Sequence, residues 1–162
     1  MKFLYLGQIE EHKGILLLLK VFSKFADHSL IIAGAGSLLK KLQSENKNSQ
    51  IHFIGPYSDP YKLLQEADCL VIPSICYENL PTVALEAIRA KTPVIGSRLG
   101  GIGEVIGNDK LLFEPTEEDL KNKLEWIIAN SDDLKKQAAI GRSQIQIPSV
   151  AEYLEAVIKY KD

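Results

Sequence analysis

Residues 2–26, KFLYLGQIEEHKGILLLLKVFSKFA, contain an apolar run, a polar loop bounded by glycines and a helical pattern, in that order. The run KFLYLG (2–7) is continuous rather than alternating, as expected of a strand buried on both faces. Around Gly14 the apolar residues begin to recur at helical spacing, which predicts a helix over 13–26. A buried strand followed by such a helix is the repeating unit of a parallel α/β sheet.

The same unit recurs along the chain. Further apolar runs of strand length are SLIIAGAG (29–36), IHFIGP (51–56), CLVIPS (69–74), PVIGS (93–97) and LLFEP (111–115). They too are continuous, which predicts strands buried on both faces. Helical patterns cover 37–45, 59–67, 81–90, 102–107 and 149–160, and Thr116 with Asp119 forms a capping-box signature that opens another helix. We therefore predict an α/β fold: a single Rossmann-like domain over 1–162, with a parallel sheet of about six strands flanked by helices.

The composition excludes several classes of function. The 162 residues are 46% hydrophobic and 25% charged, with a net charge of −2, so no electrostatic footprint for nucleic acid or an anionic membrane is present. The first apolar run is too short for a signal peptide or a membrane span, and the two cysteines then suit a reduced, cytoplasmic protein. The three histidines are scattered and nothing has metal-ligand spacing, so we expect no metal.

Ligands of open α/β sheets bind outside the carboxyl ends of the strands. One such position is the loop GQIEEHKG (7–14), where Lys13 lies at or near the start of the predicted helix. A cation there opposes the helix dipole, which makes sense if an anion such as a phosphate is bound. The alternative is a solvated lysine on a loop.

Two glycine turns follow other strands. GAGSLL (34–39) lacks the third glycine of a dinucleotide fingerprint and no acidic residue closes the next strand, so a tight turn is favoured over a nicotinamide or flavin site. No P-loop is present, and Gln8 and Pro56 stand where a receiver domain would have aspartates. GGIGEVI (100–106) allows two interpretations. Its backbone N–H groups could face a ligand, or the segment could be an ordinary turn from strand to helix, which is favoured when the segment is taken alone.

The segment YENLPTVALEAIRA (77–90) sets two glutamates in an apolar stretch. Because proline is tolerated in a first helical turn, a helix is expected to begin near 79–81, with Asn79 as its cap. Eight helical residues would separate Glu78 from Glu86 by about 12 Å. That exceeds the roughly 5–9.5 Å between the paired carboxylates of a glycoside hydrolase, so hydrolysis is disfavoured.

Two carboxylates so far apart suit an extended polar ligand better. Glu78 and Glu86 could hold hydroxyl groups at its opposite ends, and the free N–H groups of the helix start could receive its phosphates. The alternative is that Glu86 pairs with Arg89 or Lys91 on a solvated helix face.

The run ENLPTVALEAIRAKTPVIGS (78–97) resembles the E-x7-E signature of retaining, GT-B-fold glycosyltransferases of the group 1 family. The resemblance covers nearly the whole chain as the C-terminal, donor-binding domain of that family. It includes YLGQIEEHKGI (5–15), LIIAGAG (30–36), IHFIGPYSD (51–59), ADCLVIPS (67–74) and GGIGEVI. Six such pieces in the right order and at the right spacing are a specific match.

The resemblance implies a role for individual residues toward a nucleotide-diphosphate sugar. Glu86 would hydrogen-bond the ribose hydroxyls, Glu78 would contact the donor sugar, and Lys13 would neutralise the diphosphate and stabilise the leaving group. Glu78 and Lys13 are accordingly the expected catalytic residues. The remaining expected donor contacts are a close approach of the loop at Gly7, a turn at Gly55, Pro56 and Tyr57 facing the base, and the backbone around Asn79, Leu80, Pro81 and Thr82.

Two positions depart from the family pattern. Gln8 stands where the family usually has Arg in G-R-x-x-x-x-K-G, so a charged, bidentate phosphate ligand becomes a neutral one. Gly103 replaces the usual Pro of G-G-[IVL]-P-E, a milder change that loosens the turn.

The function implied is the donor-binding half of a hexosyltransferase-type glycosyltransferase of polysaccharide biosynthesis. Sugar would pass with retention from the nucleotide-diphosphate sugar, which is the donor substrate, to a glycan or lipid-linked acceptor. No cofactor is expected. We expect the N-terminal acceptor domain to be missing from residues 1–162 and to belong either to a longer form of the same polypeptide or to a separate one. The isolated chain is then expected to be inactive. In the full enzyme that domain could meet a membrane-associated acceptor at the inner face of the membrane. The alternatives are a non-catalytic nucleotide-sugar-binding module and half of a GT-B-like sugar-nucleotide epimerase.

Overall fold

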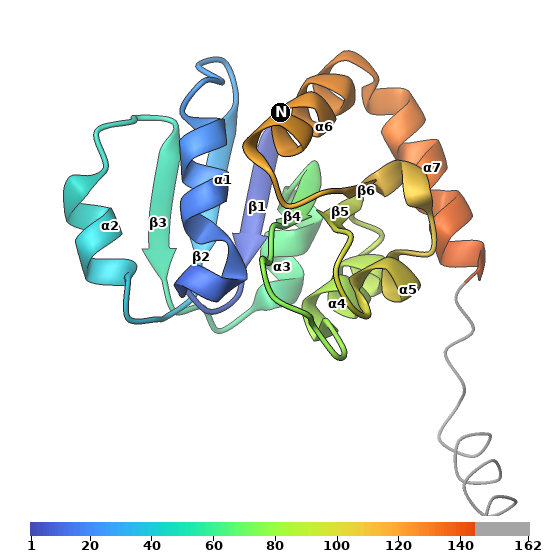
Figure 1. Cartoon of the computed structure of the whole chain (residues 1–162), viewed down its shortest axis with the longest axis horizontal. Coiled ribbons are helices and arrows are strands. Elements are labelled where there is room, and N and C mark those ends of the chain that lie inside the picture. Colours follow the sequence, from blue (N-terminus) through green and yellow to red (C-terminus); the bar gives the residue numbers. More distant parts are fainter. Residues whose placement is uncertain (145–162) are drawn as a thin grey trace, which may run out of the picture.

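The computed structural model describes residues 1–144, in which six parallel strands form one sheet with the order β3-β2-β1-β4-β5-β6 (Figure 1). The strands are β1 (Lys2–Leu6), β2 (Ser29–Ala33), β3 (Ile51–Gly55), β4 (Cys69–Ile72), β5 (Val94–Ser97) and β6 (Leu112–Phe113). The helices are η1 (Glu11–Lys13), α1 (Ile15–Phe22), α2 (Leu39–Glu45), α3 (Pro60–Glu66), α4 (Thr82–Ala90), α5 (Ile102–Ile106), η2 (Asp109–Leu111), α6 (Glu117–Ala129) and α7 (Ser131–Gln144).

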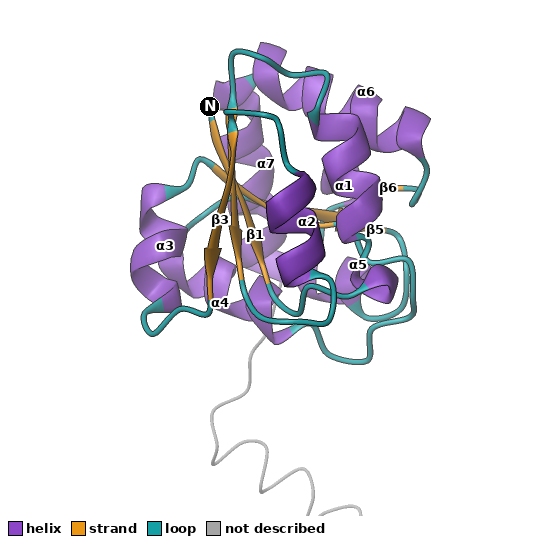
Figure 2. Cartoon of the chain, turned by 90° about the vertical axis from the view of Figure 1, so that its left-hand side faces the viewer, coloured by secondary structure: helices purple, strands orange, loops and turns teal. Residues whose placement is uncertain are grey.

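Helices cover both faces of this sheet. Figure 2 shows α1, α2 and α6 on one side, with α3 and α4 on the other, and α1 packs against α6. The predicted α/β fold with a six-stranded parallel sheet is therefore confirmed, and each strand lies within the run that predicted it. The helix expected at 149–160 falls outside the described residues.

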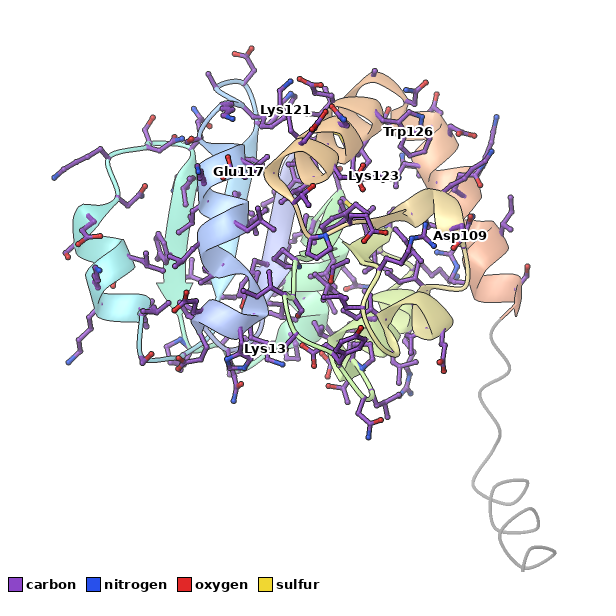
Figure 3. All side chains as sticks on the ribbon, in the orientation of Figure 1. Lys13, Asp109, Glu117, Lys121, Lys123 and Trp126 are labelled. Carbon is purple, nitrogen blue, oxygen red and sulfur yellow. The ribbon has the colours of Figure 1, made fainter. Side chains whose placement is uncertain are left out.

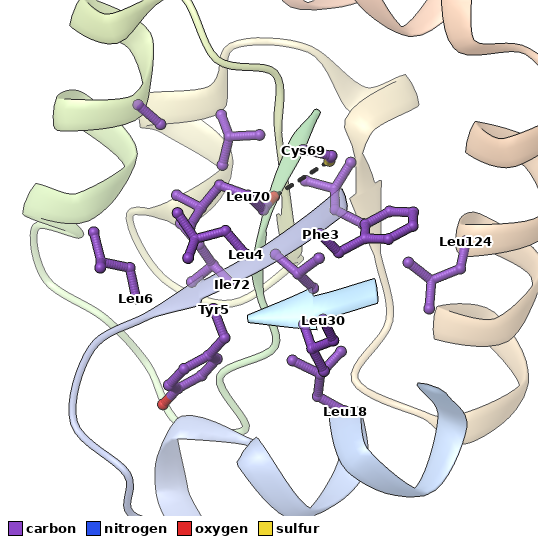
Figure 4. Close-up of a cluster of buried hydrophobic side chains, with 14 of the residues drawn as sticks. Phe3, Leu4, Tyr5, Leu6, Leu18, Leu30, Cys69, Leu70, Ile72 and Leu124 are labelled. Carbon is purple, nitrogen blue, oxygen red and sulfur yellow. Dashed lines mark hydrogen bonds between the residues drawn. The ribbon is translucent and has the colours of Figure 1, made fainter. Parts of the chain in front are cut away.

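The core is built on the central strands β1 and β4 (Figure 4). Phe3, Leu4, Tyr5 and Leu6 are at most 4% exposed, so β1 is buried on both faces as its continuous apolar run predicts. The Phe3 ring meets the Phe22 ring of α1 edge to face, at 5.6 Å between centroids. This contact fixes α1 against the strand that precedes it.

Burial on both faces does not extend to β3. His52 and Ile54 are exposed, whereas Ile51 is buried and Phe53 is half-buried. β3 is an edge strand, and its side chains point alternately to the two faces of the sheet, one of which is exposed here. The expectation of a fully buried strand at 51–56 was therefore wrong.

The helix predicted at 13–26 is shorter and begins later. Gly14 has a φ of 72° in the left-handed region, which separates the single turn η1, where Lys13 lies, from α1. The next helix boundary also differs, because α4 begins at Thr82 and Pro81 occupies its N-cap position. The expected capping by Asn79 was wrong, and the helix has no side-chain cap.

The N-terminus of α6 confirms the predicted cap in part. Thr116 Oγ1 accepts a hydrogen bond from the backbone N–H of Asp119 at 3.2 Å. The Asp119 carboxylate, however, accepts from the N–H of Glu114 rather than that of Thr116. The capping box is therefore only half formed, and its other half ties the helix to the end of β6.

The GAG turn after β2 is the tight turn that its sequence favoured. A Cβ on Gly34 would lie 1.8 Å from the Gly7 carbonyl oxygen, and one on Gly36 would lie 2.3 Å from that of Ile9. The Ile9 N–H also donates to the Ala35 carbonyl at 2.8 Å. These glycines let the loop after β2 pack directly on the loop after β1.

The strand order places a topological switch point between β1 and β4. The chain moves outward from β1 to β2 and β3, then returns to place β4 on the other side of β1. β1 pairs with β2 along five residues but with β4 only at Phe3↔Cys69 and Leu4↔Leu70. Loops leaving two such strands run in opposite directions and open a crevice, where ligands of this fold class bind.

Candidate functional site

A hollow of about 290 Å³ lies at the switch point, at the carboxyl ends of β1 and β4. Nine residues singled out from the sequence line it, namely Gly7, Gln8, Lys13, Tyr57, Glu78, Leu80, Pro81, Thr82 and Glu86. Pro56 and Asn79, expected as donor contacts, do not, and Pro56 instead lines a separate hollow beside α3. The structure thus brings most of the predicted residues to one place, from segments far apart in the sequence.

The two loops that form the hollow are attached to each other through their backbones. The Ile75 N–H donates to the His12 carbonyl at 3.0 Å. Gly14 packs so closely that a Cβ there would lie 1.8 Å from the Pro73 carbonyl oxygen. The β1–α1 loop therefore has a fixed position relative to the β4–α4 loop.

Lys13 and Glu78 form an ion pair across this junction. Lys13 Nζ donates to Glu78 Oε1 at 2.6 Å, and the two side chains are only 24% and 17% exposed. The hydroxyl of Ser74 donates to the same oxygen at 2.8 Å. Lys13 is therefore not the solvated loop lysine of the alternative interpretation.

The electrostatic surroundings keep Glu78 ionised. Partial burial acts to raise the pKa of this carboxyl group. The hydrogen bonds from Lys13 and Ser74, with the charges of Lys13 and His12, outweigh burial and hold the pKa below its ordinary value. The hollow therefore holds a carboxylate at neutral pH, able to accept hydrogen bonds from a ligand's hydroxyl groups.

Glu86 faces the hollow from α4. It is exposed, and residues 1–144 contain no ion pair between it and Arg89 or Lys91. Burial raises the pKa of the nearby Tyr57 hydroxyl, and the negative charge of Glu86 raises it further. The solvated ion pair considered from the sequence is thus not formed.

The separation estimated for the two glutamates used a wrong helix boundary. Because α4 begins at Thr82, Glu78 lies in an irregular loop and Glu86 is the fifth residue of the helix. A helical rise of eight residues does not apply to this pair. Both carboxylates nevertheless line one hollow, with the start of α4 between them.

The glycine turn GGIGEVI supports Glu78 through its backbone. The Gly101 N–H donates to the Glu78 carbonyl at 2.7 Å, and a Cβ on Gly100 would lie 2.4 Å from the same oxygen. The N–H of Gly101 is therefore already occupied within the protein. This turn positions a lining residue and does not itself line the hollow.

Tyr5 and Ser74 also line the hollow, although neither was assigned a role from the sequence. Ser74 begins the loop after β4, so its position at the end of a strand is the sequence feature that could have indicated it. The Tyr5 hydroxyl donates to the carbonyl of Gln8, and burial raises the pKa of that hydroxyl well above its usual range, with Glu78 adding to the effect. Nothing in an apolar strand indicates that its tyrosine holds the next loop.

The other ion pairs within residues 1–144 involve no residue that lines the hollow. Figure 3 shows Lys13 at the edge where the strands end, and Glu117 and Lys121 toward the opposite edge. Glu117 pairs with Lys20, and Lys121 pairs with Glu125 at 3.0 Å.

Within residues 1–144, no group of three or more His, Cys, Asp or Glu side chains could hold a metal ion. No helix in this part of the chain is long and apolar enough to cross a membrane.

Comparison with known proteins relates this geometry to one family. The family model described as glycosyl transferases group 1 matches residues 1–144. The chain belongs to this family. The membership of the group 1 family that the sequence predicted is thereby confirmed.

The curated relatives that the chain matches extend beyond the matched region. The chain is 32% identical over 158 residues to the O-antigen biosynthesis glycosyltransferase WbnH of Escherichia coli, covering 97% of this chain and 46% of the relative. It is 34% identical over 115 residues to the glycogen synthase of Mycobacterium tuberculosis, covering 65% of this chain and 28% of that enzyme. The chain therefore spans less than half the length of these relatives.

Solved structures confirm the fold as the C-terminal half of a GT-B glycosyltransferase. Anabaena Alr3699/HepE in complex with UDP matches with a TM-score of 0.82 at 16% identity, covering 98% of this chain and 48% of that one. The C-terminal domain of the group 1 glycosyltransferase LpcC from Francisella tularensis matches with a TM-score of 0.72 at 25% identity. That match covers 88% of this chain and 83% of the LpcC domain.

Proposed function

We propose that this chain is the donor-binding half of a retaining glycosyltransferase and binds a nucleotide-diphosphate sugar in the hollow between β1 and β4. The observation that carries the proposal is the convergence of Lys13, Glu78 and Glu86 on that hollow at the start of α4. One cation, two carboxylates and the free N–H groups of a helix start suit a ligand that carries phosphates between two hydroxyl-bearing groups.

Each group has a part in this proposal. Lys13 and the first N–H groups of α4 receive the diphosphate, and Lys13 stabilises the charge that develops on it as the sugar leaves. Glu86 accepts hydrogen bonds from the ribose, and Tyr57 lies on the same side of the hollow. Glu78 accepts from the sugar hydroxyls. Crystal structures of the fold neighbour from Anabaena are complexes with UDP and with UDP-glucose, which supports a nucleotide-sugar ligand for this fold.

The full reaction requires a second domain in this proposal. Curated relatives are about twice as long, and we propose that the additional part binds the acceptor, as a separate polypeptide or in the same one. The O-antigen relative supports a role in polysaccharide biosynthesis. We propose a hexose as the transferred group.

A non-catalytic nucleotide-sugar-binding module is the second candidate. Gln8, which is exposed at the edge of the hollow, favours it, because the neutral amide there cannot form the charged, bidentate phosphate contact that an arginine gives. Mixing the chain with an N-terminal half from a group 1 relative and that relative's acceptor separates the candidates, since only an enzyme forms product.

Isothermal titration of the chain with UDP-, GDP- and ADP-sugars tests donor binding. We expect binding by at least one of them, with Glu86→Ala weakening it and Arg89→Ala, three residues further along α4, leaving it nearly unchanged. Absence of binding by every nucleotide at millimolar concentration contradicts the proposal. A larger effect of Arg89→Ala than of Glu86→Ala contradicts the role of Glu86.

A further inference from the structure

The two hydrogen bonds to the Glu78 side chain end on the same oxygen atom. Lys13 Nζ lies 2.6 Å and Ser74 Oγ 2.8 Å from Oε1. Oε2 accepts no hydrogen bond from any group within residues 1–144. A carboxylate has lone pairs on both oxygens, so the arrangement leaves one oxygen anchored and the other available.

Ser74 is held more firmly than the lysine that shares its acceptor. Its side chain is 1% exposed, and it lies between Pro73, whose carbonyl contacts Gly14, and Ile75, whose N–H donates to His12. A serine hydroxyl also turns about a single bond, whereas the lysine ammonium lies at the end of a flexible four-carbon stem. The serine therefore defines the position of Oε1.

The backbone of Glu78 is fixed independently of its side chain. The Gly101 N–H donates to its carbonyl at 2.7 Å, and the residue forms a bridge with Gly100. With the backbone held on one side and Oε1 on the other, the remaining freedom of the carboxyl group is small. The direction of Oε2 is then set by Ser74 and Gly101 together.

We propose that Ser74 is a positioning residue for the donor sugar: it anchors Oε1 of Glu78, so that Oε2 accepts a hydrogen bond from a sugar hydroxyl. This inference rests on the proposed function. It also assigns different tasks to the two groups that share Oε1. When Lys13 turns its charge toward the diphosphate, the neutral serine remains as the anchor and Glu78 keeps its orientation.

The ionisation of Glu78 is consistent with this division. Partial burial opposes the ionisation of Glu78, the charges of Lys13 and His12 favour it, and the serine hydroxyl adds a neutral hydrogen bond that also favours the carboxylate. Removing the hydroxyl therefore raises the pKa of Glu78 without changing the charge of the site. This gives a readout that needs no ligand.

The experiment compares Ser74→Ala with Ser97→Ala. Ser97 is a matched control because it too is buried at the carboxyl end of a strand of this sheet, and its hydroxyl has no hydrogen-bond partner in the described part of the chain. Two quantities are measured in each variant. The first is the pKa of the Glu78 carboxyl group, by carbon-13 NMR. The second is the affinity for each nucleotide sugar compared with that for its nucleoside diphosphate, with UDP-glucose and UDP as one pair and GDP-mannose and GDP as the other.

We expect Ser74→Ala to raise the pKa of Glu78 and to weaken binding of the nucleotide sugar on the order of tenfold, as for loss of a hydrogen bond to a charged group. Binding of the corresponding nucleoside diphosphate should stay within about twofold. Ser97→Ala should change none of these quantities. In a Glu78→Ala background, Ser74→Ala should cause no further loss, since the residue through which it acts is absent.

Two results overturn the inference. An unchanged pKa of Glu78 in Ser74→Ala means that the serine does not anchor the carboxylate. Equal weakening of the nucleotide sugar and the nucleoside diphosphate means that the serine acts on the loop as a whole. If the wild-type chain binds neither ligand of either pair, nor an ADP-sugar, the proposed function fails and the sugar-positioning role fails with it. The NMR titration then still decides whether the anchor to Glu78 exists.

Discussion

Substituting Gly14 by alanine should destabilise the fold far more than the same change at Gly55. Both glycines have a φ of 72°, so an alanine costs about 1 kcal/mol of left-handed backbone strain at either position. Their surroundings differ. A Cβ on Gly14 lies 1.8 Å from the Pro73 carbonyl oxygen, whereas one on Gly55 has nothing within 4 Å.

The contact with Pro73 determines the size of the difference. Real Cβ atoms do not approach closer than 3.0 Å, so the backbone must move by about 1.2 Å at the junction of the β1–α1 and β4–α4 loops. Displacing packed backbone in this way costs about 1–3 kcal/mol. Gly14→Ala should therefore lose about 1–3 kcal/mol more unfolding free energy than Gly55→Ala.

Urea denaturation measures both variants against the wild type, with free energies compared at equal m values. Stability is the appropriate measurement, because Gly55 lies two residues from Tyr57 in the hollow and binding would not isolate the contact. Equal losses of free energy in the two variants would refute the reasoning. They would mean that the Pro73 carbonyl moves aside at no cost and that the two loops are not rigidly joined.

Three further perturbations test other parts of the structure. Gln8→Arg should strengthen binding of a nucleoside diphosphate by about fivefold, because it adds a charged phosphate ligand at the edge of the hollow; titration with UDP and GDP measures this. Because the pKa of Glu78 is lower in the folded than in the unfolded state, its carboxylate stabilises the fold above the unfolded pKa, and this stabilisation is lost as pH falls through the folded pKa. Between about pH 6 and about pH 3 the unfolding free energy should therefore fall less in Glu78→Gln than in the wild type. Thr116→Ala should cost about 1 kcal/mol in urea denaturation, because it leaves the Asp119 N–H at the start of α6 without its acceptor.

The strands were predictable because burial on both faces leaves a direct mark in the sequence. β4 and β5 are buried along their lengths and β1 is buried after Lys2, and all three lie in predominantly apolar runs. The exception, β3, is an edge strand, and strand order depends on contacts between distant segments that a local pattern does not contain. Helix boundaries failed where one backbone angle decides them, as at Gly14.

The candidate site was predictable as a set of positions but not as a set of contacts. Strand ends followed by glycines and charges indicated where Lys13, Glu78 and Glu86 would gather, and the structure places all three on one hollow. The donation by Ser74 to the same oxygen as Lys13 depends on side-chain rotamers after the two loops have packed. The hydrogen bond from Tyr5 to the Gln8 carbonyl likewise arises from a core residue, whose sequence signal is hydrophobicity alone.

Lys13 and Glu78 are separated by 65 residues, so the hollow exists only after both halves of the sheet have formed and met. A partly folded chain with one half in place holds one charge of the pair and cannot bind. Ligand affinity therefore measures the fraction of molecules that have completed folding. If the proposed function holds, a nucleotide at about one hundred times its dissociation constant adds about 2.7 kcal/mol to the stability of the whole fold and none to that of either half.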